Sequence, residues 1–356
     1  MKKLFYILIL FTCFFNSVVA QENTLIIVHP TEYNLKTIIY LVDNEIIKVD
    51  KLNIIGVYHI KEAYDYSKSY AFLDENKYPY IKLKEVKKEI SANDLYQKNN
   101  CSDIYKELFE SSNGAFFFGG PDLPPAIYGE QMNLLTKMTD PYRHYLEASF
   151  LFHLLGGSQN NQFVPLLENN TNYTIYGICL GMQTMNIATG GSMIQDIPSE
   201  VYKLNFVEEI LETENSQQHK NYNNNLVNNS TLFSGNFHQI KIINPKPLVG
   251  NYNGNSTPLV YSNHHQAIEN LGKNLEIITT SMDGKIIEAI KHKNYPNVLG
   301  VQFHPEGTYL HNPEIKYRKN PKDILKSGKQ ILMENDSYQF HLELWEIFSK
   351  KMNSEE

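Results

Sequence analysis

Gly177-Ile178-Cys179-Leu180-Gly181-Met182-Gln183 is the stretch from which the fold and the chemistry of this chain can be inferred. The run 173–178 before the cysteine is apolar and favours a β-strand, and residues 184–188 after it can continue as a helix. A cysteine between two glycines at such a junction is typical of a nucleophile elbow, a strained turn that lifts a nucleophile off a sheet. The positive end of the following helix favours the thiolate over the thiol. We therefore expect Cys179 to be a nucleophile rather than a buried structural cysteine.

A second motif, Leu299-Gly300-Val301-Gln302-Phe303-His304-Pro305-Glu306, places polar groups at the end of another apolar run. Open α/β sheets form their sites at the carboxyl ends of their strands. A histidine there can take the proton of a thiol and later protonate a leaving amine, and a carboxylate can hold the imidazole in the right tautomer. We expect Cys179, His304 and Glu306 to form a catalytic triad.

The two motifs together resemble the class I glutamine amidotransferase superfamily, whose elbow is Gly-x-Cys-x-Gly-x-Gln and whose distal motif is His-Pro-Glu. The glycine-rich loop 118–130 and the segment 190–197 look like those of the γ-glutamyl hydrolases, a cysteine peptidase branch. Residues 262–267, Ser-Asn-His-His-Gln-Ala, resemble a late histidine motif of the superfamily. The resemblance covers most of residues 25–306 and implies one α/β domain, in three layers around a mostly parallel, flavodoxin-like sheet.

Backbone N–H groups close to the nucleophile are candidates for an oxyanion hole. Gly119 and Gly120 follow an apolar strand and would supply one N–H group, and Leu180 would supply the other. A Gly-Gly-Pro sequence taken alone predicts only a turn. The elbow favours the oxyanion hole, without deciding between the two glycines.

The resemblance also implies where the substrate binds. His264 and His265 lie in a loop that would contact the γ-glutamyl part of the substrate, Gln183 would assist, and Asn263 is a weaker candidate. Either histidine taken alone could equally be an ordinary core or surface residue. No metal ion and no organic cofactor is implied.

Residues 1–20 predict export. Two lysines precede an apolar run at 4–15, and Val18-Val19-Ala20 precedes Gln21, as at the cleavage site of a signal peptide. The apolar run is too short to span a bilayer. Lipid modification at Cys13 is the alternative, although its aromatic neighbours disfavour it. We expect a secreted or otherwise extracytoplasmic protein (periplasmic, or lysosomal or vacuolar in a eukaryote) that begins near Gln21.

The composition limits the partners. Without the two lysines of residues 1–20, 30 Lys and Arg stand against 39 Asp and Glu, a net charge of about −9. This charge argues against nucleic acid or an anionic membrane as a partner, because both attract a basic surface. Outside residues 1–20 only Cys101 and Cys179 remain, so no disulfide framework is expected. A bond between the two cysteines would quench the nucleophile, and we expect Cys101 to be an ordinary residue.

Residues 21–356 are expected to form the single domain, with polar insertions near 157–172 and 204–255. The second insertion is rich in asparagine, which predicts a partly mobile surface segment. Asp140-Pro141 opens a helix whose residues Arg143 and Glu147 are expected to be solvated. The chain is expected to close with an amphipathic helix near 337–351, which buries Phe340, Leu344, Ile347 and Phe348.

Three classes of function fit these observations. The first is an exported cysteine hydrolase of γ-glutamyl amide bonds, for which the resemblance implies the poly-γ-glutamate tail of folates as the first candidate substrate. The second is a glutaminase subunit that delivers ammonia to a synthase, and the third is a catalytically silent binding protein on the same fold. The export signal argues against the second class, and the intact triad argues against the third. The expected partner is a small γ-glutamyl compound, and the oligomeric state is left open.

Overall fold

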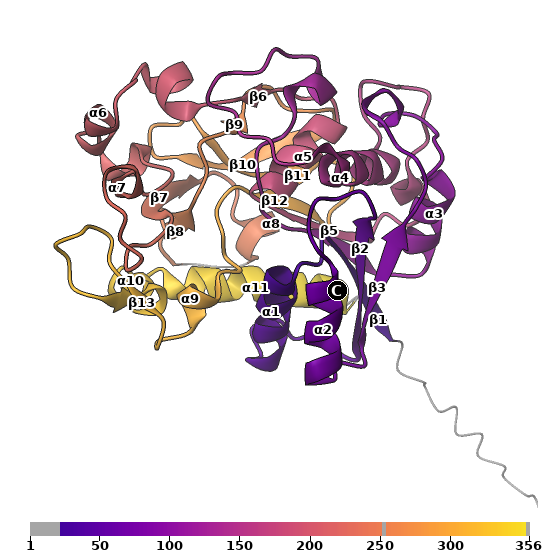
Figure 1. Cartoon of the computed structure of the whole chain (residues 1–356), viewed down its shortest axis with the longest axis horizontal. Helices are drawn as coiled ribbons and strands as arrows, with labels where there is room; N and C mark the ends of the chain where they lie inside the picture. Colours follow the sequence, from indigo (N-terminus) through magenta and orange to yellow (C-terminus); the bar gives the residue numbers. More distant parts are fainter. Residues whose placement is uncertain (1–21, 251–253, 354–356) are drawn as a thin grey trace, which may run out of the picture.

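A ten-stranded sheet is the centre of the computed structural model, which describes residues 22–250 and 254–353 (Figure 1). Its strand order is β3-β2-β1-β4-β5-β12-β11-β10-β7-β8. The six strands from β3 to β12 are parallel, and the pairs from β12 to β8 are antiparallel. The strands are β1 (Asn23–Val28), β2 (Leu52–His59), β3 (Ile81–Val86), β4 (Gly114–Phe117), β5 (Thr174–Ile178), β7 (Asn236–Ile242), β8 (Leu259–Ser262), β10 (Leu275–Ser281), β11 (Ile287–His292) and β12 (Val298–Val301). The expected signal peptide, residues 1–20, lies outside the described residues.

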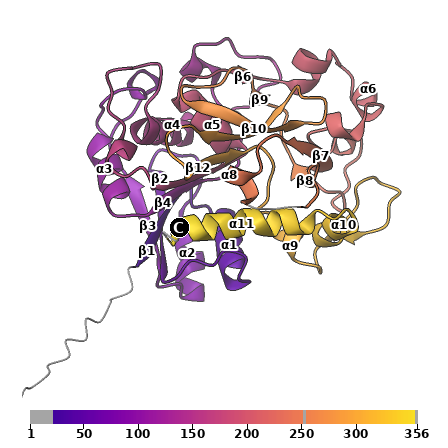
Figure 2. The same ribbon diagram turned by 180° about the vertical axis from the view of Figure 1, so that it is seen from behind.

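Helices cover both faces of the sheet and make a three-layer α/β domain (Figures 1 and 2). The first face carries α3 (Ser102–Glu110), α4 (Pro141–Leu155) and α5 (Leu180–Ala188). The second face carries α1 (Glu32–Asp43), α2 (Ser67–Asn76), α8 (Lys246–Val249) and α11 (Tyr338–Met352). Strand β1 shows why both faces are covered, since Ile26 packs on the first and Ile27 on the second. The expected fold class is confirmed.

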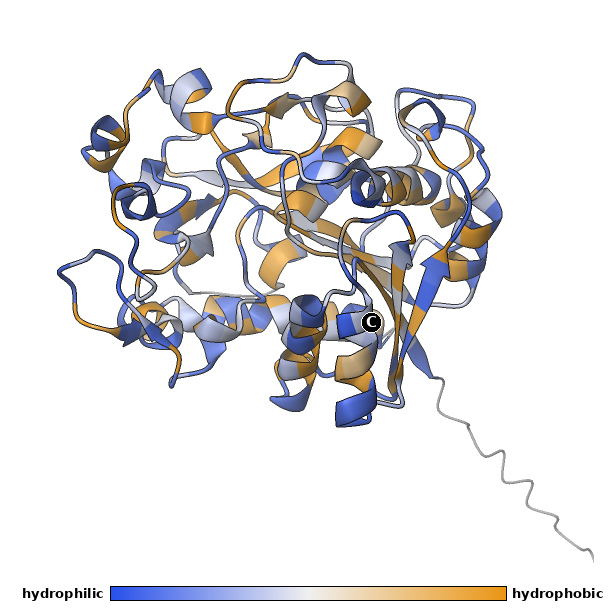
Figure 3. Cartoon of the chain, in the orientation of Figure 1, coloured by the Kyte–Doolittle hydropathy of each residue, from blue (hydrophilic) through white to orange (hydrophobic). Residues whose placement is uncertain are grey.

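Shorter elements surround these layers. Figure 3 shows apolar residues concentrated in the central strands and on the inner sides of the helices, and polar residues in the outer loops. The shorter elements are β6 (Met193–Ile194), α6 (Val207–Leu211), α7 (Asn223–Leu226), β9 (Ala267–Ile268), α9 (Thr308–His311), β13 (Lys316–Tyr317), β14 (Lys326–Ser327) and α10 (Gly328–Glu334). No helix among residues 22–250 and 254–353 is long and apolar enough to cross a membrane.

Helix α4 begins as expected but is buried on more sides than expected. The Asp140 carboxylate accepts a hydrogen bond from the Tyr142 N–H at 2.8 Å, which caps the first turn. The prediction that Arg143 and Glu147 are solvated is wrong, because their exposed fractions are 4% and 0%. The α4 face that carries them is covered by the loop after β4, and their charges pair at 2.7 Å from Nε to Oε1.

Residues 204–250 of the asparagine-rich segment contain more regular structure than their composition indicates. It contributes β7, which pairs with β10 and β8 inside the main sheet. Within β7, Phe237, His238 and Ile240 are buried while Gln239 is exposed. Low hydrophobicity averaged over the whole segment concealed this one buried strand, so the expectation of a surface loop fails for β7.

Helix α11 lies across the second face of the sheet (Figure 2). It buries Phe340, Leu344 and Phe348 as expected, whereas Ile347 is only half-buried. Trp345 was not among the residues expected to be buried, yet it is fully buried, with its ring centroid 6.2 Å from that of Phe116. The Trp345 indole N–H donates to the Pro305 carbonyl at 3.2 Å, so α11 also supports the turn that carries the expected base.

Replacing Trp345 by alanine is expected to lower the free energy of unfolding by about 3–5 kcal/mol, because it removes a large buried ring and leaves a cavity. Glu346→Ala is the matched control, since Glu346 is the exposed neighbour on the same helix and should change stability by less than about 0.5 kcal/mol. Denaturant unfolding of both variants measures the difference. Equal effects of the two substitutions would contradict the role assigned to Trp345.

Candidate active site

The turn between β5 and α5 places Cys179 as a nucleophile elbow does. Cys179 has φ 50° and ψ −104°, which is unusual for a residue with a side chain, and α5 begins at the next residue. Its N–H donates to the Val301 carbonyl at 2.7 Å. A Cβ atom built on Gly177 would lie 2.7 Å from the carbonyl carbon of Gly181, so the two glycines of the motif allow helix and strand to approach closely.

The expected triad comes together at this turn. His304 Nδ1 lies 2.7 Å from Glu306 Oε1, and the ring lies with Cys179 against Gly119. Burial alone would lower the pKa of His304. The charges of Glu306 and of the cysteine sulfur outweigh this effect and hold that pKa well above its ordinary value. The raised pKa favours the imidazolium form of His304, which can give a proton to a leaving amine.

The loop after β4 lies directly against the triad. A Cβ atom on Gly119 would come within 2.6 Å of His304 Cε1 and 3.5 Å of Cys179 Cβ, so only glycine fits there. Arg143 Nη2 donates to the carbonyls of Phe118 at 3.2 Å and Gly119 at 3.0 Å. Each of these carbonyls points toward the guanidinium, and in a trans peptide the N–H of the next residue points the opposite way.

Three N–H groups therefore fit the expected oxyanion hole. The N–H groups of Gly119, Gly120 and Leu180 are not among the loop and turn N–H groups that donate to a backbone carbonyl in the described part of the chain. Gly119 is half-buried and Gly120 is exposed. The buried Arg143 sets the orientation of this loop, a role that the sequence analysis did not assign because the residue was expected in solvent.

Two buried glutamines lie behind the sulfur. Gln302 Nε2 donates to Cys179 Sγ at 3.4 Å, and Gln183 Nε2 lies 3.2 Å from Gln302 Oε1 and 3.3 Å from the Gln266 carbonyl. Gln183 is thus engaged behind the cysteine and is 3% exposed. Gln302 was not predicted as a site residue. Its position in the second motif, two residues before His304, could have indicated that it lies at the site.

The late histidine loop divides into residues with different surroundings. Asn263 is exposed and lies toward the asparagine-rich segment. His264 is buried, and its Nδ1 donates to the Gln266 carbonyl at 2.8 Å. His265 lies between two carboxylates, with Nε2 3.0 Å from Asp122 Oδ2 and Nδ1 3.1 Å from Asp196 Oδ1.

His265 consequently ties the loop of Gly119 and Gly120 to the rest of the site, because Asp122 belongs to that loop. Burial opposes its protonation, but the hydrogen bonds to Asp122 and Asp196 prevail and raise the pKa of His265 to about 8. Of the four expected substrate contacts, the structure places His265 beside the glycine loop and Gln183 behind the sulfur.

Comparison with known proteins shows to which family this chain belongs. The Peptidase C26 family matches residues 54–306, which is well over half of the sequence. The chain belongs to the Peptidase C26 family. The glutamine amidotransferase-like protein YvdE of Lactococcus lactis subsp. lactis is 30% identical over 191 residues, covering 54% of this chain and 64% of that protein. The glutamine amidotransferase-like protein RP404 of Rickettsia prowazekii is 28% identical over 251 residues, covering 65% of this chain and 82% of that protein.

The match to a solved structure is weaker. A Thermoplasma acidophilum protein, described as part of a GMP synthase, aligns with a TM-score of 0.39 and 13% identity, over 84% of this chain and 94% of that chain. The alignment with YvdE spans just under two thirds of that relative's length. The Peptidase C26 family and the two relatives establish a member of the class I glutamine amidotransferase superfamily.

Replacing His265 by asparagine is expected to destabilise the protein in a pH-dependent way. Because the pKa is raised in the folded state from 6.5 to about 8, the contribution of His265 is complete below pH 6.5 and disappears as the pH rises through about 8. The loss should be about 2 kcal/mol larger at pH 6 than at pH 9, as measured by denaturant unfolding.

His292→Asn is the control for this experiment. Burial lowers the pKa of His292 to about 4, so the stability lost in this variant should not shrink between pH 6 and pH 9. A pH-independent effect of His265→Asn would mean that the two carboxylates do not bind a charged ring.

Proposed function

We propose that this chain is an exported hydrolase of γ-glutamyl amide bonds, with folate poly-γ-glutamate as the first candidate substrate. The observation that carries the proposal is Cys179 on its elbow, with the His304–Glu306 pair beside it and the Gly119 loop across from it. The relatives support the γ-glutamyl part, because they are described as glutamine amidotransferase-like and the amide of glutamine is a γ-glutamyl amide.

The first half of the reaction breaks the amide bond. The Cys179 thiolate attacks the γ-carbonyl carbon, and the carbonyl electron pair moves to oxygen. The N–H groups of Leu180 and of Gly119 or Gly120 stabilise this oxyanion. His304, which is an imidazolium at this stage, gives its proton to the departing amine as the C–N bond breaks. The products of this half are a free amine, a γ-glutamyl thioester on Cys179 and a neutral His304.

The second half releases the glutamyl group. The neutral His304 takes a proton from water through the nitrogen that faces the sulfur, and the resulting hydroxide attacks the thioester carbonyl. The C–S bond breaks, the sulfur leaves as a thiolate, and the imidazolium is restored beside it. Glu306 keeps its hydrogen bond to Nδ1 throughout and thereby holds the ring in one orientation.

A glutaminase subunit is the alternative that the relatives' descriptions favour. Such a subunit passes ammonia to a partner and needs a stable interface, whose centre is commonly aromatic and apolar. The asparagine-rich part of the insertion, around 221–229, is polar and mostly exposed. We therefore infer that water accepts the γ-glutamyl group and that the chain acts without a synthase.

The isolated protein is expected to hydrolyse a γ-glutamyl peptide, to turn over free glutamine poorly, and to leave the α-linked isomer of the peptide intact. Release of amino acids from each compound, followed by chromatography, measures these rates. Cys179→Ala should lower the rate by about 10⁶-fold, whereas Glu306→Gln should cost about a hundredfold less, as for the acidic member of another triad. A strong preference for glutamine, or activity only after a second protein is added, would favour the glutaminase subunit.

The mature protein is expected to begin near Gln21 and to be recovered outside the cytoplasm. Expression of the full sequence in an export-competent host, fractionation and N-terminal sequencing test this expectation. A cytoplasmic protein that retains residues 1–20 would contradict export. The hydrolase activity would then still be decided separately, by the activity assay. A substitution of Ala20 by a bulky residue is the matched control, because it should block cleavage without touching the described domain.

A further inference from the structure

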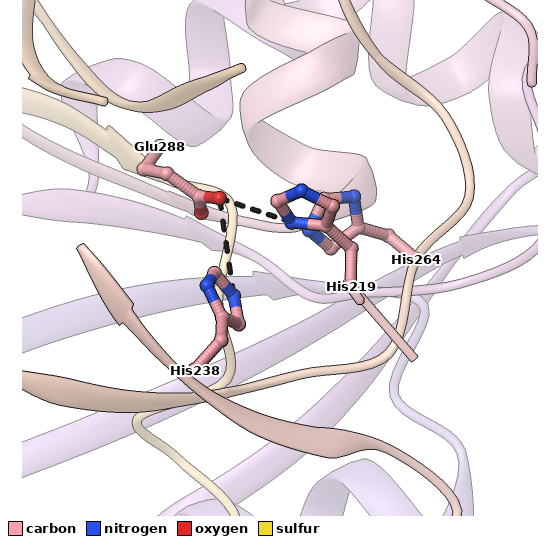
Figure 4. Close-up of side chains that lie close together, drawn as sticks. All are labelled: His219, His238, His264 and Glu288. Atoms are coloured by element: carbon pink, nitrogen blue, oxygen red, sulfur yellow. Dashed lines mark ion pairs between the residues drawn. The ribbon is translucent and has the colours of Figure 1, made fainter. Parts of the chain in front are cut away.

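Three histidines and a glutamate that do not belong to the expected triad converge in the interior (Figure 4). We call this group the histidine–glutamate cluster; its members are His219, His238, His264 and Glu288. Their exposed fractions are 1%, 0%, 6% and 0%, in that order. One ligand atom of each lies within 4.8 Å of the corresponding atoms of the other three.

The topology explains why these side chains meet at one edge of the sheet. β7 and β11 run antiparallel to β12, so each begins at the edge where the parallel strands end. His238 is the third residue of β7 and Glu288 the second of β11. His264 follows the end of β8, and its N–H donates to the His219 carbonyl at 3.0 Å.

Several polar atoms of the cluster have no hydrogen bond within the described residues. They are both ring nitrogens of His219, Nε2 of His264 and both carboxylate oxygens of Glu288. His219 Nδ1 lies 3.2 Å from Glu288 Oε1, but without the angle of a hydrogen bond. Buried polar atoms are almost always hydrogen-bonded, so a group of unpartnered atoms that face one another calls for an occupant.

Two of the histidines are oriented as metal ligands are. His264 Nδ1 contacts the Gln266 carbonyl at 2.8 Å, and His238 Nδ1 contacts the Gln239 carbonyl at 3.2 Å. A backbone carbonyl that accepts from one ring nitrogen places the lone pair on the other nitrogen, which is the usual outer contact of a metal-bound histidine. In both rings the remaining nitrogen is Nε2. His264 Nε2 has no hydrogen bond among the described residues, whereas His238 Nε2 accepts from the Ser262 hydroxyl at 2.8 Å and lies 3.9 Å from Glu288 Oε1, so a metal ion there would replace the Ser262 contact.

An irregularity in the sheet aims the carboxylate at the histidines. Ile287 and Ala289 of β11 pair with Thr280 and Thr279, which are consecutive residues of β10. Glu288 is therefore the extra residue of a β-bulge, a feature that redirects a side chain. Figure 4 shows its carboxylate pointing toward His219 and His238.

We propose that the histidine–glutamate cluster is a closed structural site for one zinc ion. Zinc takes three nitrogen ligands and one carboxylate oxygen in a tetrahedron, and bonds of about 2.0–2.1 Å place neighbouring ligands about 3.4 Å apart. The ligand atoms now lie within 4.8 Å of one another, so zinc binding would draw them closer. Four protein ligands leave no open position for a reacting water, which distinguishes this site from a catalytic one.

The ion has a definite structural task in this position. It joins the asparagine-rich segment, through His219 and His238, to strand β11 of the main sheet and to the loop after β8. The same loop carries His265, which binds the Asp122 carboxylate beside the glycine loop. Zinc binding therefore fixes the insertion and the late histidine loop together.

Zinc binding to the full-length protein, prepared without a polyhistidine tag, tests this proposal. Cys179→Ala is the working background, because a thiolate beside His304 is itself a possible zinc ligand. After removal of metal with a chelator, we expect this protein to bind one zinc per chain by mass spectrometry of the metal and by competition with a chromophoric chelator. Zinc should raise its melting temperature by a few degrees. Adding His219→Gln should raise the zinc Kd at least a hundredfold and abolish the thermal shift.

His341→Gln is the matched control, since His341 is fully buried but outside the cluster and should leave the zinc Kd unchanged. Cobalt replacement keeps the proposal testable if the His219 variant does not fold, because tetrahedral cobalt gives intense visible absorption bands in the otherwise unaltered site. Absence of these bands, absence of bound zinc, or equal zinc affinity with and without His219 would overturn the proposal.

Discussion

The left-handed backbone at Cys179 is the constraint on which the active site depends. A residue with a side chain in this conformation costs of order 1–3 kcal/mol, so the surrounding structure must enforce it. β5 is paired on both sides, with β4 and with β12, and the Cys179 N–H continues the second pairing through the Val301 carbonyl. α5 packs against the end of β4 because Gly181 has no side chain. The sheet and the helix, rather than the cysteine itself, therefore determine where the sulfur lies.

A single edge of the sheet collects the polar chemistry of the molecule. Parallel strands bring their last residues to this edge, as β5 does for Cys179, and antiparallel strands bring their first residues there, as β11 does for Glu288. The two groups are coupled through the backbone, since the Gln302 N–H donates to the Glu288 carbonyl at 2.8 Å. Residues far apart in the sequence thus become neighbours through strand direction alone.

Local sequence signals were sufficient for the parts of the structure that depend on near neighbours. The elbow around Cys179, the capped start of α4 and the apolar face of α11 are all encoded within a few residues. The first two have the predicted form, and α11 has it except at Ile347 and Trp345. Arg143 was placed wrongly because its burial depends on a loop from another part of the chain. β7 was missed because averaging over a polar segment hides one short alternating strand.

The histidine–glutamate cluster could not have been predicted from spacing. Its members are separated by at least 19 residues, and no short metal-ligand motif connects them. They are brought together by the reversal of strand direction after β12 and by a bulge in β11, and neither feature leaves a periodic signal. The expected triad, in contrast, could be predicted from the sequence, because each of its two halves lies within a compact motif.

The Pro305 carbonyl has a consequence for the order in which the active site matures. It accepts one hydrogen bond from His311 Nε2 at 2.9 Å and another from the Trp345 indole at 3.2 Å. Trp345 is translated 40 residues after Pro305, at a time when most of the sheet has already left the ribosome. A nascent chain that exposes Cys179 therefore still lacks the contact between Trp345 and the turn that carries His304. Pro305 gains its second hydrogen bond only when α11 docks, so this turn is completed last.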